Sequence, residues 1–596
     1  MASASEVWAG LAARVLGSGS DGRGGIVAEQ PIMVAAVATL LVVLVTTRLT
    51  TGRPPTKANE RLANGKASVR NPPVVSHWIP FVGNTPWMLL DKEGFLEGLR
   101  HRFEGIFSMT MMGTSHYFVH KPSLASAIFS MHRTEAEEPF VRNRAMSHIF
   151  LFPNVASGPA FDAVVSETQA QYKFLLSEPS LGKMVAGVVR CVRRDIADFV
   201  TFNAFPADQA EWERRAGADV VDDAGGDGRG AQAVEVDLFQ LVRNFVARTA
   251  MPSIFGSDLV ENFPDMVDML WLLDDAFLLL AAGWPAWIPN PRVQRGRAAR
   301  RRLLDYLREY GEAMARHRAG EDAGARWQNL DDASDMVKTR ADVWRRHDLS
   351  LDGRAALDLS LMWALSANAN PLIVWILFEV ARDPVLVEQI REEIAPHVRA
   401  VQPSHDFGPA VWVSPELGDV DVEALVTRCP LLKAAYVETA RLYASTWILE
   451  LITHDTVLKD SGKEGGGGAY LLKAGSCAHV PIELHTRDPS AFPDPNEWRP
   501  ERHVKETVNA QGEKVLTADM GSIRLYGGGA KMCKGRSYAV REILLYVAVI
   551  LSFYDIVPIK GGPWPKPKLN RNAGACHPAK PLRVWIKKRK LPKAEP

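Results

Sequence analysis

The stretch RLYGGGAKMCKGRSYAVR, residues 524–541, decides the fold of this chain, because it places a single thiol between a glycine loop and a helix. The apolar run Tyr538–Phe553 that follows is typical of a buried helix, so Cys533 is expected just before the first helical turn. At a helix start, the dipole and the unpaired backbone N–H groups stabilise a thiolate. This stretch therefore predicts a reactive or metal-binding sulfur.

The residues around Cys533 favour a flat ligand over a phosphate. Lys531 and Lys534 add positive charge beside the sulfur, while Gly529 and Gly535 let the backbone approach a ligand closely. The GxxxxGK(S/T) pattern of a phosphate-binding loop is absent from the sequence. A thiolate held in this way suits iron, to which an anionic sulfur donates electron density that favours O–O cleavage.

An acid and two arginines upstream of this loop predict a structural cluster. Glu438 and Arg441 are three residues apart and share one face of an expected helix, so their side chains can pair. Arg502 supplies a second guanidinium further along the chain. A buried glutamate held by two arginines would form a rigid support for the cysteine loop.

A long uncharged segment predicts a buried helix with a bend. Residues 359–378 contain no charged side chain, as in a membrane span. However, Ser366, Asn368, Asn370 and Pro371 lie in its middle, where lipid would penalise polar groups. We therefore expect a core helix that is bent at this polar point.

The amino terminus predicts a membrane anchor. Residues 31–47 carry no charge and would span about 26 Å as a helix, enough for a bilayer core. Basic residues predominate between Arg48 and Arg70, which places the following chain in the cytosol. A cleaved signal peptide is the alternative, although the apolar run starts late and no small-residue cleavage site follows it.

We expect the chain to be mainly α-helical with small peripheral β-sheets. A short lumenal segment (1–30) precedes the transmembrane anchor (31–49) and a basic, proline-rich linker (50–75), and the catalytic domain covers 76–596 with a solvated insertion at about 205–235. The apolar stretch 276–289 is either core or a segment that dips into the bilayer.

Composition excludes several classes of protein. The chain has 70 Lys+Arg against 69 Asp+Glu and a net charge of +1, so no electrostatic argument favours nucleic acid as a partner. Its five cysteines are too few and too scattered for a disulfide scaffold or a paired zinc site. With 47% hydrophobic residues, the chain has ample material for a large core.

Together these features resemble the cytochrome P450 family of haem-thiolate oxygenases, from about Pro72 to the carboxy terminus. The haem loop of that family is matched by Tyr526, Gly529, Lys531, Cys533 and Gly535, with Tyr for the usual Phe and Lys for the usual Arg or His. Its Glu-x-x-Arg motif corresponds to Glu438 and Arg441, with Arg502 as the third member. The resemblance implies the P450 fold, one large domain behind an N-terminal transmembrane helix, and heme b whose iron takes its axial thiolate from Cys533.

The central helix is similar to one branch of this family. Most members place an acid and a threonine above the haem, where they organise the water that delivers protons to oxygen. Here Asn368 stands at the position of the acid and Ala369 at that of the threonine, followed by Asn370. The pattern resembles the branch of sterol 7α- and 12α-hydroxylases and prostacyclin synthase. Hydroxylases of this branch generally keep the threonine, whereas prostacyclin synthase, a peroxide isomerase, does not.

Three activities remain open. The first is a monooxygenase of the endoplasmic reticulum membrane that hydroxylates a lipophilic sterol, terpenoid or other secondary metabolite. Because the chain has no dinucleotide fingerprint, its electrons would come from a separate NADPH-cytochrome P450 reductase. The second is a reductase-independent isomerase or dehydratase of an oxygenated substrate, which Ala369 favours. The third is a haem-binding sensor or carrier without turnover.

The resemblance also implies smaller assignments. Lys173 and Arg524 are candidates to meet the haem propionates, although the family's Trp-x-x-x-Arg helix is absent. Four residues are expected to face the substrate, namely Ser366, Ser445, Thr446 and Trp447.

Overall fold

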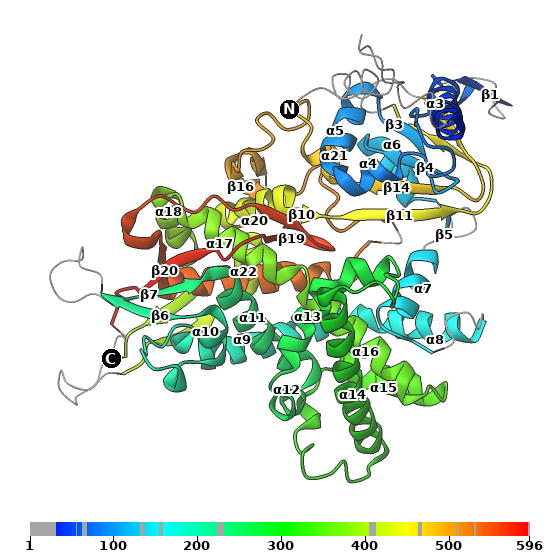
Figure 1. Cartoon of the computed structure of the whole chain (residues 1–596). Helices are drawn as coiled ribbons and strands as arrows, with labels where there is room; N and C mark the ends of the chain where they lie inside the picture. Colours follow the sequence, from blue (N-terminus) through cyan, green and yellow to red (C-terminus); the bar gives the residue numbers. More distant parts are fainter. Residues whose placement is uncertain are drawn as a thin grey trace, which may run out of the picture. The chain divides into compact units, whose positions relative to one another are not determined.

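The computed structural model describes eleven stretches of the chain (Figure 1). They are residues 31–54, 56–61, 68–131, 136–137, 139–153, 159–222, 232–403, 413–462, 468–508, 512–529 and 532–593. The chain divides into two compact units, one drawn from Met1–Glu137 and Leu449–Val480 and the other from Glu138–Ile448 and Pro481–Pro596. All the predicted site residues fall in the second unit.

The first unit begins with the predicted apolar helix and otherwise consists of short helices and two sheets. The helix α3 (Pro31–Thr51) contains a span, Met33–Thr51, that is long and apolar enough to cross a membrane, with none of it buried. The other helices are α4 (Thr85–Leu90), α5 (Lys92–Arg102) and α6 (Pro122–Phe129). One sheet has the order β1 (Thr56–Arg61), β2 (Ser68–Asn71), β13 (Ala469–Leu472), β12 (Thr456–Lys459). The other has the order β3 (Ile106–Met111), β4 (Thr114–Val119), β14 (Cys477–Pro481), β11 (Trp447–Ile452), β5 (Ala136–Glu137).

The second unit is mainly helical, as predicted. Its first helices are α7 (Pro139–His148), α8 (Pro159–Ala170), α9 (Ser180–Asp195), α10 (Glu211–Ala216), α11 (Leu238–Phe255), α12 (Ser257–Asn262), α13 (Met266–Ala281), α14 (Pro291–Ala319) and α15 (Asp335–Arg346). The later ones are α16 (Leu351–Ser366), α17 (Ala369–Ala381), α18 (Pro384–Ile394), α19 (Val422–Thr427), α20 (Pro430–Tyr443), α21 (Glu483–Thr486) and α22 (Arg536–Phe553). The 3₁₀ turns of this unit include η1 (Gln171–Leu175), η5 (Pro500–His503) and η7 (Ile559–Gly561).

Four of these helices form the core of the second unit. The helices α9, α11, α17 and α22 pack against one another, and Figure 1 shows α9, α11 and α22 side by side. From Ala369 to Val380, every residue of α17 is buried. A helix that is apolar all round belongs in the centre of a large domain, which explains why this uncharged segment is core rather than a membrane span.

The central helix bends where the sequence predicts. Helix α16 ends at Ser366 and α17 begins at Ala369, so the break falls at Ala367 and Asn368. Pro371 has no N–H to donate to the carbonyl of Ala367, and its ring crowds that carbonyl. In the apolar 18-residue part of the span that includes both helices, Leu351–Ala381, 78% of the residues are buried.

Small sheets complete the second unit. A four-stranded sheet has the order β17 (Tyr554–Val557), β20 (Arg583–Lys588), β7 (Gln232–Asp237), β6 (Asp219–Asp222), and a three-stranded one has the order β10 (Ala444–Ser445), β19 (Gly574–Pro578), β18 (Leu569–Arg571). Two pairs are β15 (Val504–Val508) with β16 (Lys514–Ala518) and β8 (Val398–Val401) with β9 (Glu416–Val420). Within β10 and β19, Ser445 lies opposite Gly574.

Two stretches turn out to be mixed in character. Between 205 and 235, where a solvated insertion is predicted, the described residues form α10, β6 and β7, with Glu213 and Val234 buried, whereas 223–231 lie outside the described residues. The apolar stretch 276–289 buries Phe277 but leaves Trp287 82% exposed. Part of this stretch is therefore core, whereas its end is exposed at the surface, where it can contact solvent or lipid.

Candidate functional site

The thiol of Cys533 lies three residues before α22, as the sequence predicts. Its side chain is exposed, whereas the other cysteines, 191, 429, 477 and 576, are buried or half-buried. The backbone N–H of Cys533 donates to the carbonyl of Tyr526 at 2.9 Å, and the Arg536 guanidinium donates to the carbonyl of Cys533 at 2.9 Å. These two bonds close the loop and leave the sulfur accessible.

One glycine of the loop has a backbone conformation that favours glycine, and a second glycine keeps the sulfur clear. Gly529 has a φ of +60°, which favours glycine. At Gly535, a Cβ would lie 3.9 Å from the sulfur of Cys533, so any longer side chain would crowd it. The predicted Lys531 lies outside the described residues.

A pair of tyrosines joins the loop to α20. The hydroxyl of Tyr526 lies 2.5 Å from that of Tyr436, in hydrogen-bond contact. Burial raises the pKa of Tyr526, and the negative charge of Cys533 raises it further. Burial raises the pKa of Tyr436 as well, so both hydroxyls stay protonated and can bridge the loop and the helix.

The donor set fits a haem-thiolate centre. Among the described residues, no group of three or more His, Cys, Asp or Glu side chains could hold a metal ion. Cys533 would therefore bind iron as a lone protein ligand, which requires a macrocycle to supply the remaining donors. An exposed thiol beside glycines has the room that such a flat group needs.

The predicted cluster of Glu438 and two arginines is present, and it contains a fourth member. The Arg441 guanidinium donates to both Glu438 oxygens, at 2.7 and 2.8 Å, and Arg502 forms an ion pair with Glu438 at 3.2 Å. His503 lies 2.8 Å from the other Glu438 oxygen. Burial would raise the pKa of Glu438, but the bonds from Arg441 and His503 outweigh it and lower the pKa to about 2. We name these four residues the Glu438 cluster.

The Glu438 cluster supports the chain around it. Arg441 also donates to the carbonyls of Thr486, Pro495 and Glu497, at 2.8, 2.7 and 3.1 Å. It therefore ties α20 to the segment that leads towards η5. The position of His503 next to Arg502 was the only sign in the sequence that it belongs to the cluster.

The polar residues of the bend point to different neighbours. The amide of Asn370 donates to the carbonyl of Arg243 in α11 at 3.2 Å. Asn368 instead lies against Gly574 of β19, where a Cβ would sit 1.7 Å from the Asn368 amide oxygen. Of the two predicted amides, only Asn368 faces the β18–β19 hairpin. Ala369, between them, is buried and offers no hydroxyl.

A buried carboxyl that the sequence analysis missed lies beside the bend. Glu542 of α22, with Tyr538, Ser366 and Asn370, lines a cavity of about 20 Å³, close to the size of one water molecule. Burial raises the pKa of Glu542 to about 8, and the Tyr538 hydroxyl at 3.5 Å only partly opposes this effect. Glu542 is therefore mostly a neutral acid at pH 7. The predicted substrate residue Ser366 faces this cavity.

The raised pKa of Glu542 predicts a pH-dependent stability. The folded state holds the proton more tightly than the unfolded chain, whose glutamates have a pKa near 4.5, so stability is fully present below about pH 4.5 and falls as the pH rises to about 8. This loss amounts to about 3 to 5 kcal/mol. Glu542→Gln should flatten the dependence of the thermal unfolding midpoint on pH. The control is Glu423→Gln, which removes an exposed ion-pair partner of Arg541, a residue on the same helix as Glu542. If the unfolding midpoints of the two variants depended equally on pH, the raised pKa would not belong to Glu542.

The remaining predicted residues lie as follows. Lys173 is exposed in η1, with its ammonium 5.3 Å from the centre of the Phe174 ring. Arg524 donates to the carbonyl of Gly521 at 3.0 Å. Ser445 and Trp447 are half-buried, and the Thr446 hydroxyl donates to the carbonyl of Leu525 at 3.2 Å, which links the strand after α20 to the cysteine loop. These contacts leave the propionate and substrate roles as predictions.

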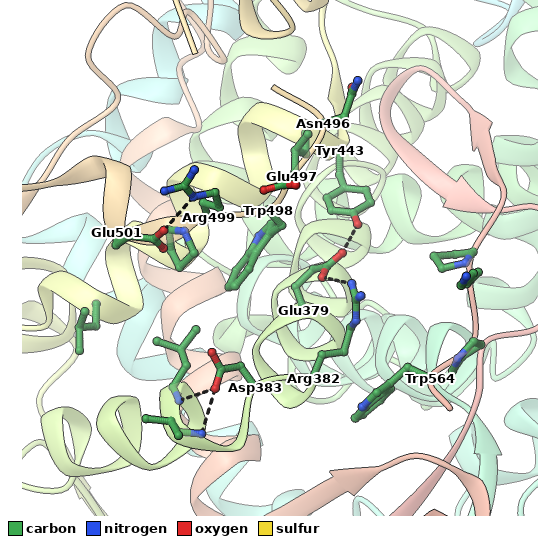
Figure 2. A pocket seen from close by; sticks show the side chains of 18 of the residues that line it. Glu379, Arg382, Asp383, Tyr443, Asn496, Glu497, Trp498, Arg499, Glu501 and Trp564 are labelled. Carbon is green, nitrogen blue, oxygen red and sulfur yellow. Dashed lines mark hydrogen bonds and ion pairs between the residues drawn. The ribbon is translucent and has the colours of Figure 1, made fainter. Parts of the chain in front are cut away.

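An open cleft of about 1140 Å³ lies elsewhere in the second unit and holds none of the predicted catalytic or haem-binding residues (Figure 2). It includes Glu379, which accepts hydrogen bonds from the Tyr443 hydroxyl and from Arg382. Trp498 and Trp564 also line it. The cleft adjoins the Glu438 cluster through Glu497, but the cysteine loop contributes no lining residue.

Comparison with known proteins agrees with this geometry. The chain is 24% identical to "Cytochrome P450 monooxygenase efuG" of Hormonema carpetanum over 551 residues, which cover 86% of this chain and 89% of the relative. It is 20% identical to "Cytochrome P450 7B1" of Mus musculus (82% of this chain, 85% of the relative) and 26% identical to "25-hydroxycholesterol 7-alpha-hydroxylase" of Rattus norvegicus (55% and 72%). The family profile "Cytochrome P450" matches residues 72–584. The chain therefore belongs to the cytochrome P450 family, oxidoreductases that carry haem iron on a thiolate.

Proposed function

We propose that this chain is a membrane-anchored monooxygenase that oxidises a lipophilic small molecule with dioxygen and electrons from a separate NADPH-cytochrome P450 reductase. The observation that carries the proposal is the exposed thiol of Cys533 in its glycine loop before α22. Haem iron bound through this thiolate supplies the oxygen-activating chemistry. Tyr526 and Arg536 hold the loop, and the Glu438 cluster supports the chain around it.

The bend between α16 and α17 would take part in proton delivery. With alanine at 369, no hydroxyl stands at the position next to Asn368. The Asn368 amide can orient a water molecule by hydrogen bonding, but it cannot itself supply a proton at neutral pH. We therefore infer that the proton comes from water held near Asn368 or from a hydroxyl of the substrate.

The substrate is proposed to be a sterol, a terpenoid or a similar secondary metabolite. One relative is named a 25-hydroxycholesterol hydroxylase, which is consistent with a bulky lipophilic substrate. Ser445, Thr446 and Trp447 follow α20 directly and are half-buried, so they can line a pocket of mixed polarity. Ser366 faces the Glu542 cavity in this structure and would contact a substrate only if that cavity opens.

The anchor supports a location in the endoplasmic reticulum membrane. Helix α3 is long and apolar enough for one span, and the basic residues that follow it favour a cytosolic catalytic domain. A membrane location would give a lipophilic substrate direct access and would bring the chain to a membrane-bound reductase.

A second candidate function is a reductase-independent isomerase or dehydratase of an oxygenated or peroxide substrate. Ala369 favours it, because a reaction that needs no dioxygen activation needs no hydroxyl for proton delivery. The same haem-thiolate centre would serve both reactions, so the need for electrons separates them.

The deciding experiment compares turnover of candidate lipids by the full-length holoprotein with and without reductase and NADPH. We expect product only in the complete system, with stoichiometric NADPH consumption. Cys533→Ser protein is the control, since any product it forms has another source. Turnover that persists without electrons would reject the monooxygenase and favour the isomerase.

A further inference from the structure

A buried carboxylate lies far in sequence from the cysteine loop, on α13. The residue Asp274 is 1% exposed, whereas Asp275, the next residue on the helix, is exposed. A buried carboxylate is costly unless hydrogen bonds replace the lost water. The partners of Asp274 therefore indicate what it does.

The partners of Asp274 come from two other segments. The indole N–H of Trp363 in α16 donates to one carboxylate oxygen at 2.8 Å, and the Asn572 amide donates to the other at 2.9 Å. The ring nitrogen of His577 lies 3.7 Å from that second oxygen. Phe277, one turn along α13, stacks on Trp363 with ring centres 3.9 Å apart. One carboxylate thus joins α13, α16 and the β18–β19 hairpin.

The same hairpin turn touches the bend of the central helix. The N–H of Ala573 donates to the side-chain oxygen of Asn572 at 2.9 Å, which shapes the turn. Gly574 follows with a φ of +97°, and a Cβ there would lie 1.7 Å from the Asn368 amide oxygen. Three consecutive residues, 572–574, therefore bridge Asp274 on one side and Asn368 on the other.

Arg243 is the cationic residue with a marked effect on Asp274. Arg243 of α11 stacks over the rings of Phe239 and Trp271 at 5.1 and 4.7 Å, and its charge favours the ionised carboxylate. Burial lowers the pKa of His577 to about 3, with Arg243 adding to the effect, so His577 is uncharged. Asp275, the next residue on α13, carries a charge that raises the pKa of Asp274. The other acids that act on Arg243 are Asp237 and Asp268.

Together these surroundings give Asp274 a pKa slightly below neutral. Burial raises its pKa to about 6, against the opposing effects of the Trp363 bond and of Arg243. Above that pH both carboxylate oxygens accept hydrogen bonds. Below it one oxygen becomes a hydroxyl, and the bond from the Asn572 amide is weakened.

We propose that Asp274 is a positioning residue, which through Asn572 holds the β18–β19 turn against Asn368 and so sets where the Asn368 amide lies. The mechanical part of this inference concerns the folded chain alone. Its consequence for oxidation rests on the proposed function, because only then does Asn368 orient water for the reaction.

The test uses hydrogen exchange, measured by mass spectrometry on the purified full-length holoprotein. In Asp274→Asn, we expect the amides of 569–578 to exchange about tenfold faster, because a hydrogen bond to a charged group is lost, while the reference strand β7 is unchanged. Asp275→Asn is the matched control and should behave as wild type. In wild type, the exchange rate of the turn, corrected for the intrinsic rate at each pH, should rise as the pH is lowered from about 8 to about 5. In Asp274→Asn this pH dependence should be lost.

A second pair of variants probes the contact with Asn368 without touching Asp274. Gly574→Ala places a methyl group on the Asn368 amide, whereas Gly324→Ala, in the loop after α14, has the same φ of +97° with open space around its Cβ among the described residues. Only Gly574→Ala should speed exchange of 569–578. This comparison keeps the inference testable even if Asp274→Asn fails to accumulate as holoprotein.

The outcomes separate the inference from the proposed function. The positioning role would be overturned if residues 569–578 exchanged at the wild-type rate in both Asp274→Asn and Gly574→Ala. It would also be overturned if exchange in β7 rose by the same factor, which would leave Asp274 a general stability residue. With reductase and substrate, Asp274→Asn should form less product per NADPH at little change in KM. If the turn exchanges faster in the variants but product formation in wild type does not depend on the reductase, the positioning role is retained and the monooxygenase is rejected.

Discussion

Full-length Cys533→Ser protein is expected to lose the reduced carbon monoxide spectrum of a thiolate-bound haem. A serine hydroxyl stays protonated at neutral pH and is a poor donor to iron, so it cannot replace the thiolate that tunes the haem. The substitution is nearly isosteric, and the side chain is exposed, so folding should change little. The measurement is the difference spectrum, with haem content determined in parallel.

Cys191→Ser is the control for this experiment. Cys191 is half-buried on α9, and burial raises the pKa of its thiol, which keeps it protonated and unsuited to iron. The control should keep the wild-type spectrum. A thiolate spectrum that survives in Cys533→Ser would show that another cysteine holds the iron, and the assignment of the site would fall.

Glu438→Gln is expected to yield little folded holoprotein. The side chains of Glu438 and Arg441 are both fully buried, so removal of the negative charge strands the Arg441 guanidinium in the core. Breaking one side of a buried ion pair costs about 3 to 5 kcal/mol, a large part of the stability of a typical domain. The measurement is haem incorporated per polypeptide, together with the midpoint of urea unfolding.

A neighbouring arginine provides the matched control for Glu438→Gln. Arg499 gives its backbone N–H to Glu438 at 2.9 Å, but its side chain is 46% exposed and pairs only with exposed acids. Arg499→Ala keeps the backbone donor and loses only surface ion pairs, so it should cost less than about 1 kcal/mol. Equal haem contents in the two variants would contradict a structural role for the Glu438 cluster.

The low pKa of Glu438 adds a second measurement. Because its pKa falls from 4.5 in the unfolded chain to about 2 in the fold, the cluster stabilises the protein above about pH 4.5 and loses this contribution as the pH falls towards 2. The difference in the free energy of unfolding between wild type and Glu438→Gln should therefore become smaller as the pH falls. This sign is opposite to that expected for Glu542, whose contribution is lost as the pH rises.

Much of the site could be read from short-range patterns. The glycines around Cys533, the helix after it and the three-residue spacing of Glu438 and Arg441 all depend on local backbone geometry, which the sequence states directly. The bend at Pro371 is equally local, because this proline lacks an N–H for the carbonyl of Ala367 and its ring crowds that carbonyl. For the same reason, the buried helix and the apolar anchor helix were both predicted correctly as helices.

Other features depend on which residues meet across the fold. Asn368 and Asn370 look alike in the sequence, but one lies against Gly574 and the other bonds to α11. His503 gave no signal of its own, since a histidine becomes a partner of Glu438 only when η5 packs on α20. Glu542 reads as an ordinary helix glutamate until the surrounding helices bury it.

The sequence by itself determined the family, the predicted iron ligand Cys533 and the bend of the central helix, because each is encoded by residues close together in the chain. Only the tertiary structure decided that Asp274 meets Trp363 and Asn572, and that the same turn reaches Asn368. Trp363 and Asn572 lie 89 and 298 residues from Asp274 in the sequence, and the pKa of Asp274 follows from burial, which exists only once the chain has folded.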